Sequence, residues 1–164
     1  MKYRHLGTSG LLMSRVTLGT MTFGAPDWGC DEKAPRALIT EYDEIKNIAY
    51  IKMTGKVDSK DILDALDRAV SSEKYKSGMG RLWDFTEIDL TSLASEVIAE
   101  MAQYSLQFPP GVRDVKVAFA VTKPLEYGLT HMFQAYSDVY AASHVMVFDT
   151  VHKAEAWMRE DKDT

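Results

Sequence analysis

The chain has 164 residues, of which 46% are hydrophobic, and this is enough apolar material for one domain with one buried core. Its 24 acidic and 19 basic side chains are interspersed and give a formal net charge of −5, so no basic surface is available for a phosphate backbone. Nucleic acid is therefore not an expected partner. The single cysteine, Cys30, cannot form an internal disulfide or a zinc knuckle, which suits a reducing compartment.

Histidine spacing and hydropathy exclude two further classes of protein, namely metal-binding proteins and membrane-spanning proteins. The four histidines show neither HxxxH nor HxH spacing, so no metal site is expected. No run reaches the roughly eighteen apolar residues that a membrane span requires. The start of the chain also lacks the apolar run and small-residue cleavage site of a signal peptide. We therefore expect a cytoplasmic protein.

The first 36 residues differ in character from the rest. Residues 2–16 favour a hairpin with its turn at residues 7–10, and residues 16–23 form a strand-like run. Residues 25–36 hold two of the five prolines and show little periodicity, which is typical of a linker. We expect an N-terminal extension and linker over residues 1–36 and a main domain over residues 37–164.

From residue 37 onward, strand and helix periodicities alternate. The expected strands are 37–45, 48–57, 78–88, 114–122 and 144–149, and the expected helices are 58–70, 93–108, 124–136 and 151–160. The short turn at Lys46-Asn47 favours an antiparallel pairing of the first two strands. Residues 114–122 are apolar on both faces, which indicates a central strand covered by helices on both sides. The order β-β-α-β-α-β-α-β-α predicts an α/β layered sheet with parallel crossovers and one antiparallel edge.

The opening segment resembles a reductase family. MKYRHLGTSGLLMSRVTLGTMTFG, followed by Trp28-Gly29 and Asp31-Glu32, is similar to the N-terminus of the aldo-keto reductases, where it forms the hairpin under the barrel and the first barrel strand. The resemblance covers about residues 1–32, and no later segment resembles the catalytic aspartate, tyrosine, lysine and histidine of that family. A (β/α)8 barrel also needs about 250 residues. An aldo-keto reductase fragment is therefore only a remote alternative.

The main domain resembles the STAS domains, in particular their SpoIIAA-like branch. The residues that carry the resemblance are the element order with IKMTGKVDSKDILDALDRAV, GRLWDFTEIDLTSL and EAWM, over about residues 37–160. The resemblance implies a non-catalytic interaction module. The best understood members are anti-sigma-factor antagonists, which are switched by phosphorylation of a serine at the start of the helix after the third strand. A helix N-terminus holds a phosphate well, and the added charge repels a docked partner.

The phosphorylation motif of that family is matched only in part. The family pattern is a strand that ends in Asp, a loop, and then Asp-Ser-Ser-Gly, whereas this chain reads WDFTEIDLTSLAS. Asp84 matches the strand aspartate, Asp89 matches the motif aspartate, and Thr91 and Ser92 take the hydroxyl positions. Leu93 stands where the family has glycine. These four matching residues are the candidate phosphorylation or partner switch, and the alternative is that Thr91 or Ser92 simply caps the second helix.

The acidic residues near this motif also raise the question of catalysis. Asp84, Glu87 and Asp89 lie at the carboxyl end of a predicted strand, where open α/β sheets place ligand crevices. Such carboxylates can hold a divalent cation or transfer protons. No nucleophile, no histidine at local spacing and no glycine-rich phosphate loop accompanies them. We therefore assign no catalytic residue, metal or cofactor, and we do not expect an enzyme.

Methionine and aromatic side chains on the second and third predicted helices suggest another function. Such side chains usually belong to a core, but they can also line a pocket for an apolar ligand. The SpoIIAA-like fold is similar to lipid-carrying domains, which implies a carrier or sensor of a small apolar or lipid-like ligand. The candidate pocket residues are Met101, Tyr104, Phe108, Leu125, Met132, Phe133 and Tyr136.

The same two helices could instead supply a dimer surface through Tyr127, Tyr136 and Tyr140, because exposed aromatic residues favour interfaces. The leading hypothesis is a non-catalytic STAS-type regulatory module. It would bind a protein partner, or a second copy of itself as a homodimer, through the surface around Asp84 to Ser95. The ligand carrier is the alternative.

Overall fold

A computed structural model describes residues 3–5, 12–14 and 37–160. The chain divides into two units, Met1–Lys33 and Ala34–Thr164. In the first unit, β1 (Tyr3–His5) pairs antiparallel with β2 (Leu12–Ser14). This pairing confirms the two arms of the predicted N-terminal hairpin. Its turn, the strand-like run at 16–23 and most of the segment that resembles the aldo-keto reductases lie outside the described residues.

The second unit is built on a five-stranded sheet in the order β3-β4-β5-β6-β7. Its strands are β3 (Ala37–Asp43), β4 (Ile48–Lys56), β5 (Gly80–Asp89), β6 (Lys116–Ala120) and β7 (His144–Phe148). The β3–β4 pair is antiparallel, and the other three pairs are parallel. The predicted layered α/β sheet with one antiparallel edge is confirmed.

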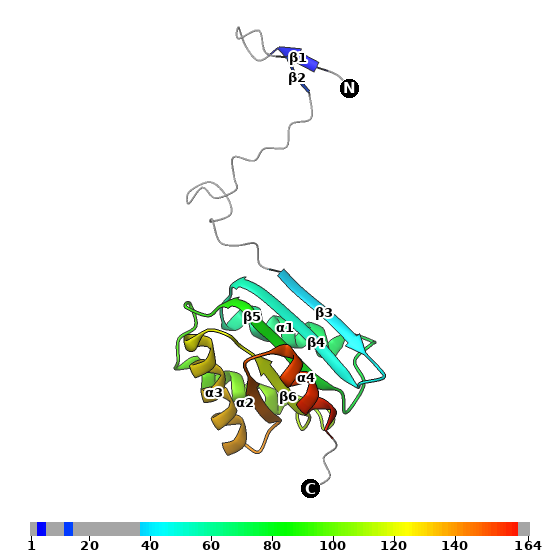
Figure 1. Ribbon diagram of the computed structural model, residues 1–164, viewed down its shortest axis with the longest axis vertical. Helices are drawn as coiled ribbons and strands as arrows, with labels where there is room; N and C mark the ends of the chain where they lie inside the picture. The colour runs from blue at the N-terminus through cyan, green and yellow to red at the C-terminus, as the bar shows by residue number, and fades with distance from the viewer. Residues whose placement is uncertain (1–2, 6–11, 15–36, 161–164) are drawn as a thin grey trace. The chain divides into compact units, whose positions relative to one another are not determined.

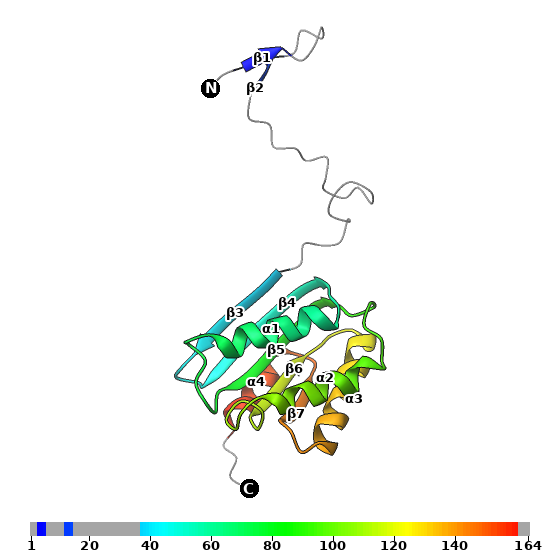
Figure 2. The same ribbon diagram turned by 180° about the vertical axis from the view of Figure 1, so that it is seen from behind.

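Helices cover both faces of this sheet. Figures 1 and 2 show α1 (Ser59–Ser71), α2 (Val97–Tyr104) and α3 (Pro124–Val139) on one face and α4 (Val151–Arg159) on the other. The larger core lies under the three helices and contains Ile51, Trp83 and Phe119, while the smaller one lies under α4 and contains Leu82 and Met158. None of the helices in the described ranges is long and apolar enough to cross a membrane.

The interior strands differ in one respect from the prediction. Residues 117–120 of β6 are buried, so this strand is covered on both faces as expected. However, the middle strand of the sheet is β5, and β6 lies one place nearer to the edge. The expectation that 114–122 is central is therefore wrong by one strand. Burial of both faces marks any interior strand, because it depends on the helix layers and not on the position within the sheet.

Local signals fix the starts of three helices. α1 begins with a capping box, in which Asp58 accepts from the backbone N–H of Asp61 at 2.9 Å and the Asp61 carboxylate accepts from the N–H of Asp58 at 3.0 Å. Pro124 occupies the first turn of α3, where its missing N–H is not needed. Thr150 caps α4 by accepting from the N–H of Lys153.

The second helix starts later than predicted. α2 begins at Val97, its N-cap Glu96 makes no side-chain capping bond, and a 3₁₀ turn at Ser105–Gln107 follows it. Residues 91–92 and 95–96 lie in turns and residues 93–94 are irregular, and the side chain of Asp89 holds the first turn by accepting from the N–H and hydroxyl of Thr91, local bonds that compete with helix. The alternative that Thr91 or Ser92 caps α2 is therefore wrong.

Candidate functional site

The C-terminal half of β5 and the turn that follows it contain two similar hydrogen-bonded motifs, the first within the strand and the second at its end. In the first, Oδ1 of Asp84 accepts from the hydroxyl of Thr86 at 2.6 Å and from its backbone N–H at 3.1 Å. In the second, Oδ1 of Asp89 accepts from the hydroxyl of Thr91 at 2.6 Å and from its N–H at 2.9 Å. The Thr91 hydroxyl and N–H are the main reason that the pKa of Asp89 lies below its ordinary value.

The second motif, the Thr91 turn, is attached to the beginning of α3. The backbone N–H of Leu90 donates to Oε1 of Glu126 at 3.1 Å, and Glu126 is buried. The ammonium group of Lys123 donates to the carbonyl of Ile88 at 2.5 Å. These two bonds fix the peptide on either side of Asp89, so the Thr91 turn stands at a defined position beside the first turn of α3.

The four predicted switch residues lie along this segment. Asp89 and Thr91 are in direct contact, and Thr91 and Ser92 are exposed. Asp84 is half-buried, and the ammonium of Lys52 lies 3.7 Å from its carboxylate and 2.8 Å from that of Glu87. Glu87, followed by Asp84, raises the pKa of Lys52. Two members of the acidic cluster therefore already share one cation of the chain itself.

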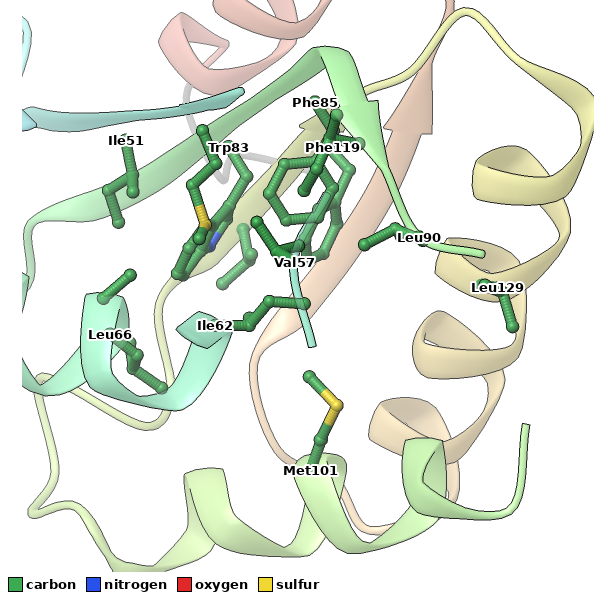
Figure 3. Close-up of a cluster of buried hydrophobic side chains, with 14 of the residues drawn as sticks. Ile51, Val57, Ile62, Leu66, Trp83, Phe85, Leu90, Met101, Phe119 and Leu129 are labelled. Carbon is green, nitrogen blue, oxygen red and sulfur yellow. The ribbon is translucent and has the colours of Figure 1, made fainter. Parts of the chain in front are cut away.

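A second candidate site is an interior cavity of about 60 Å³ between the sheet and the layer of α1, α2 and α3. Figure 3 shows Met101 pointing from α2 toward the sheet, with Ile62 of α1 and Leu129 of α3 on other sides. The sheet contributes Trp83 and other aromatic rings, of which Phe85 and Phe119 have centroids 5.4 Å apart. Most of the wall is therefore aliphatic or aromatic.

Two of the seven predicted pocket residues, Met101 and Phe133, line this cavity. The other five have different surroundings. The hydroxyl of Tyr104 donates to the Asp67 carboxylate of α1 at 2.9 Å, and its ring packs edge-on against Phe108 at 5.7 Å. Leu125 and Met132 are exposed, and Tyr136 stacks with Tyr140 at 6.5 Å.

The cavity lining also includes polar side chains that the sequence analysis did not select. Arg81 lines the cavity and is only 3% exposed. Its Nη1 donates to the carbonyl of Val112 at 2.7 Å, and its Nη2 donates to the hydroxyl of Ser143 at 3.2 Å. Its Nε has no partner, and neither does the hydroxyl of Ser137, which lines the same cavity. Burial lowers the pKa of Arg81 from its ordinary value.

A strand pattern could have revealed Arg81. Side chains at alternate positions of a strand point to the same face, so Arg81 shares the face of Trp83 and Phe85. An arginine two residues before two core aromatics is thus a sequence signal for a buried charge. For Ser137 the sequence holds no comparable signal, because small polar residues are common on exposed helix faces.

Metal ligation finds no support in this geometry. Among residues 3–5, 12–14 and 37–160, no three His, Cys, Asp or Glu side chains gather in a group that could hold a metal ion. The candidate sites are therefore an exposed turn with two hydroxyls and an apolar cavity with one buried guanidinium.

Comparisons with known proteins give similarity at the level of fold. No family model matches the sequence, and none of the curated proteins compared with it matches. One similar solved structure is an uncharacterised protein of the DUF3478 family with a SpoIIAA-like fold from Shewanella loihica PV-4. It has 17% identity and a TM-score of 0.49, and the match covers 75% of this chain and 93% of that one.

A second similar solved structure is an anti-sigma factor antagonist from Mycobacterium paratuberculosis. It has 13% identity and a TM-score of 0.51, and the match covers 83% of this chain and 98% of that one. At this identity the likeness concerns the fold and not the activity. The main domain thus shares the mixed α/β fold of this anti-sigma factor antagonist, as the sequence predicts.

Proposed function

We propose that this chain is a non-catalytic STAS-type interaction module that binds a protein partner through the turn surface, defined as residues 84–95 with the first turn of α3. In this proposal residues 37–164 are the module and residues 1–36 are an extension. The observation that carries it is the hydrogen bond from Leu90 to Glu126, which holds the exposed hydroxyls of Thr91 and Ser92 at a defined position. The fold shared with an anti-sigma factor antagonist supports the same reading.

Phosphorylation of this surface would act through charge. The Thr91 hydroxyl donates to Asp89 at 2.6 Å, and a phosphate on that oxygen would replace the donor by nearly two negative charges beside a carboxylate. The turn would then open and its partner would be repelled. A phosphate on Ser92 would place the same charge one residue further along. In this proposal the modification therefore releases the partner.

Partner capture with phosphate-mimicking variants tests this proposal. Thr91→Asp or Ser92→Asp should remove a protein that the natural chain retains in a pull-down, while circular dichroism stays unchanged. His152→Asp is the matched control, because it adds an acidic side chain to α4 on the opposite face of the sheet. Retention of the same proteins by the natural chain and by both turn variants would contradict the proposal.

A second candidate function is a carrier or sensor of a small apolar ligand, and the interior cavity favours it. The cavity holds more than the 10–15 Å³ that one water needs, and its wall is mostly apolar. α2, which forms one wall, has only eight residues and no side-chain cap. In this proposal α2 is the element that moves to admit the ligand, because short uncapped helices open at low cost.

Native mass spectrometry of the full-length protein tests the carrier proposal and reports the oligomeric state in the same spectrum. We expect an added mass after expression with abundant lipid. Ile62→Phe should fill part of the cavity and reduce that adduct, whereas Leu125→Phe, a similar enlargement on the exposed side of α3, should leave it unchanged. A clean apo mass, or an adduct that Ile62→Phe leaves unaltered, would argue against the carrier.

A further inference from the structure

Two buried polar atoms without a hydrogen-bond partner belong to side chains that line the same cavity. They are Nε of Arg81, at the beginning of β5, and the hydroxyl of Ser137, near the end of α3. Both residues are almost completely buried, with 3% and 1% of their surface exposed. Buried polar groups are nearly always hydrogen-bonded, so a pair of unpaired ones in one cavity indicates a missing partner.

The missing partner is also expected to carry negative charge. A guanidinium group stays protonated even where burial lowers its pKa. The groups that Arg81 contacts are neutral: the carbonyl of Val112, the hydroxyl of Ser143 and, at 3.5 Å, the hydroxyl of Tyr75. No carboxylate of the described part of the chain forms an ion pair with it. A buried positive charge is unfavourable unless an opposite charge balances it.

The rest of the cavity indicates what else that partner contains. Most of the remaining wall is made of aliphatic and aromatic side chains from three helices and two strands, among them Leu63, Leu66 and Phe119. The hydroxyls of Ser105 and Thr130 also belong to the lining, but both already donate to backbone carbonyls. A single water could satisfy Nε of Arg81, but it would leave both the charge and the apolar volume of about 60 Å³ without a partner. A molecule with an anionic end and an apolar body satisfies both.

We propose that this cavity binds a small carboxylate with an apolar tail, whose carboxylate oxygens accept hydrogen bonds from Nε of Arg81 and from the hydroxyl of Ser137. A carboxylate fits better than a phosphate monoester, because one negative charge balances one guanidinium whereas the phosphate carries nearly two. The tail lies among the apolar side chains between the sheet and α2. This inference rests on the second proposed function, in which the cavity accepts a ligand.

Calorimetric titration of the full-length protein with matched probes tests the inference. The probes are propionate and butyrate, each compared with the straight-chain alcohol of the same length, because a cavity of about 60 Å³ holds only about four to six heavy atoms. We expect the carboxylate to bind about tenfold or more tightly than the alcohol, because a hydrogen bond to a charged group contributes more than a neutral one. Ser137→Ala should weaken carboxylate binding several-fold and leave alcohol binding nearly unchanged.

Two further variants examine the charge itself. Arg81→Met should abolish the preference for carboxylate, and Arg81→Lys should retain part of it, because lysine keeps the charge but lacks the planar fork. Lys153→Met is the matched control, since it removes an exposed positive charge on α4 that pairs with Asp149. If Arg81→Met does not fold, Ser137→Ala and Arg81→Lys still decide the question.

The outcomes separate this inference from the proposal on which it rests. Equal binding of alcohol and carboxylate by the natural chain would overturn the carboxylate site and leave the apolar-ligand proposal standing, with water as the partner of the two unpaired atoms. Failure of every probe to bind would reject both. An undiminished carboxylate preference in Ser137→Ala and Arg81→Lys would place binding elsewhere and also overturn the inference.

Discussion

The buried carboxylate of Glu126, in the first turn of α3, accepts a hydrogen bond from the backbone N–H of Leu90, and the two atoms lie 3.1 Å apart. Leu90 follows directly after β5 and precedes the exposed Thr91 turn. A side chain of one helix thus satisfies a backbone donor in the loop between β5 and α2. This bond fixes the position of the candidate partner surface relative to α3.

Loss of this bond should destabilise the protein. Glu126→Ala leaves the Leu90 N–H without a partner in a buried position, which costs about 1–3 kcal/mol. Glu126→Gln should cost less, because its amide oxygen can still accept. Urea unfolding gives the free energies, and faster hydrogen exchange at the Leu90 amide should accompany the alanine variant. Equal stability of the alanine variant and the natural chain would show that the bond contributes nothing.

The Thr91 turn should also affect the pKa of Asp89 in a pH titration. The pKa of Asp89 lies below the ordinary 3.8, first because of the Thr91 hydroxyl and then because of the Thr91 N–H. A lowered carboxyl pKa contributes stability above the unfolded-state value that is lost as the pH falls through the folded-state value. Thr91→Val should raise the pKa of Asp89 toward 3.8, as measured by carboxyl-carbon NMR. Ser92→Ala is the control and should leave it unchanged.

Other carboxylates of the main domain should make stability depend on pH in the same direction. The pKa values of Asp43, Asp149 and Glu155 are also lowered, through hydrogen bonds to the backbone of Lys46, to the side chain of Lys153 and to the side chain of Lys46, respectively. We therefore expect the free energy of unfolding to decrease below about pH 4, where these groups take up protons. Denaturant titrations between pH 3 and 6 would measure this. Constant stability across that window would contradict the assigned bonds.

Two glycines should respond in opposite directions to the same substitution. Gly111 has a φ of +84°, and a Cβ there would lie 1.9 Å from the Ser77 hydroxyl oxygen, so Gly111→Ala should destabilise by at least about 1–2 kcal/mol. Gly128 lies within α3 with open space around it, so Gly128→Ala should stabilise by about 0.5–1 kcal/mol. Thermal unfolding shows whether each substitution raises or lowers the stability of the protein. A Gly111→Ala variant as stable as the natural chain would refute the left-handed turn.

The outer side of α3 provides a prediction about self-association. Leu125, Met132 and Val139 are spaced seven residues apart and are 46%, 36% and 77% exposed, respectively. Exposed apolar residues at this spacing lie on one side of a helix and favour a helix–helix contact. We expect sedimentation velocity to show a concentration-dependent dimer that Met132→Lys disrupts. Lys60→Met, a change on α1, should not affect it, and a monomer at all concentrations would exclude this contact.

The element order could be predicted because its signals are local. Each of these signals depends on neighbours in sequence. They include the alternation in residues 48–56, the apolar run of 117–121 and the capping box at Asp58 and Asp61. The start of α2 could not be predicted in the same way. Its apolar spacing continues from Leu93, but the Asp89 side chain holds a turn at Thr91 and regular helix begins only at Val97.

The inward face of α3 explains why only two of the seven predicted pocket residues line the cavity. Apolar periodicity selects Leu125, Leu129, Met132, Phe133 and Tyr136. Of these only Leu129 is among the buried residues of the helix, which are Glu126, Leu129, Thr130 and Ser137. Polar side chains occupy the inward face because tertiary partners are available to some of them, such as the N–H of Leu90 for Glu126. Apolar periodicity cannot identify an inward face that is partly polar.

The sequence by itself thus determined the order of strands and helices and the mixed sheet, since periodicity, caps and turns act over a few residues. Only the tertiary structure decided which side chains meet. The bond between Leu90 and Glu126 joins residues 36 apart in sequence, and the bond between Arg81 and Ser143 joins residues 62 apart. The alternation of β5 indicates that Arg81 faces inward, but the cavity that it lines forms only where α1, α2 and α3 pack on the sheet, and no local pattern encodes that packing.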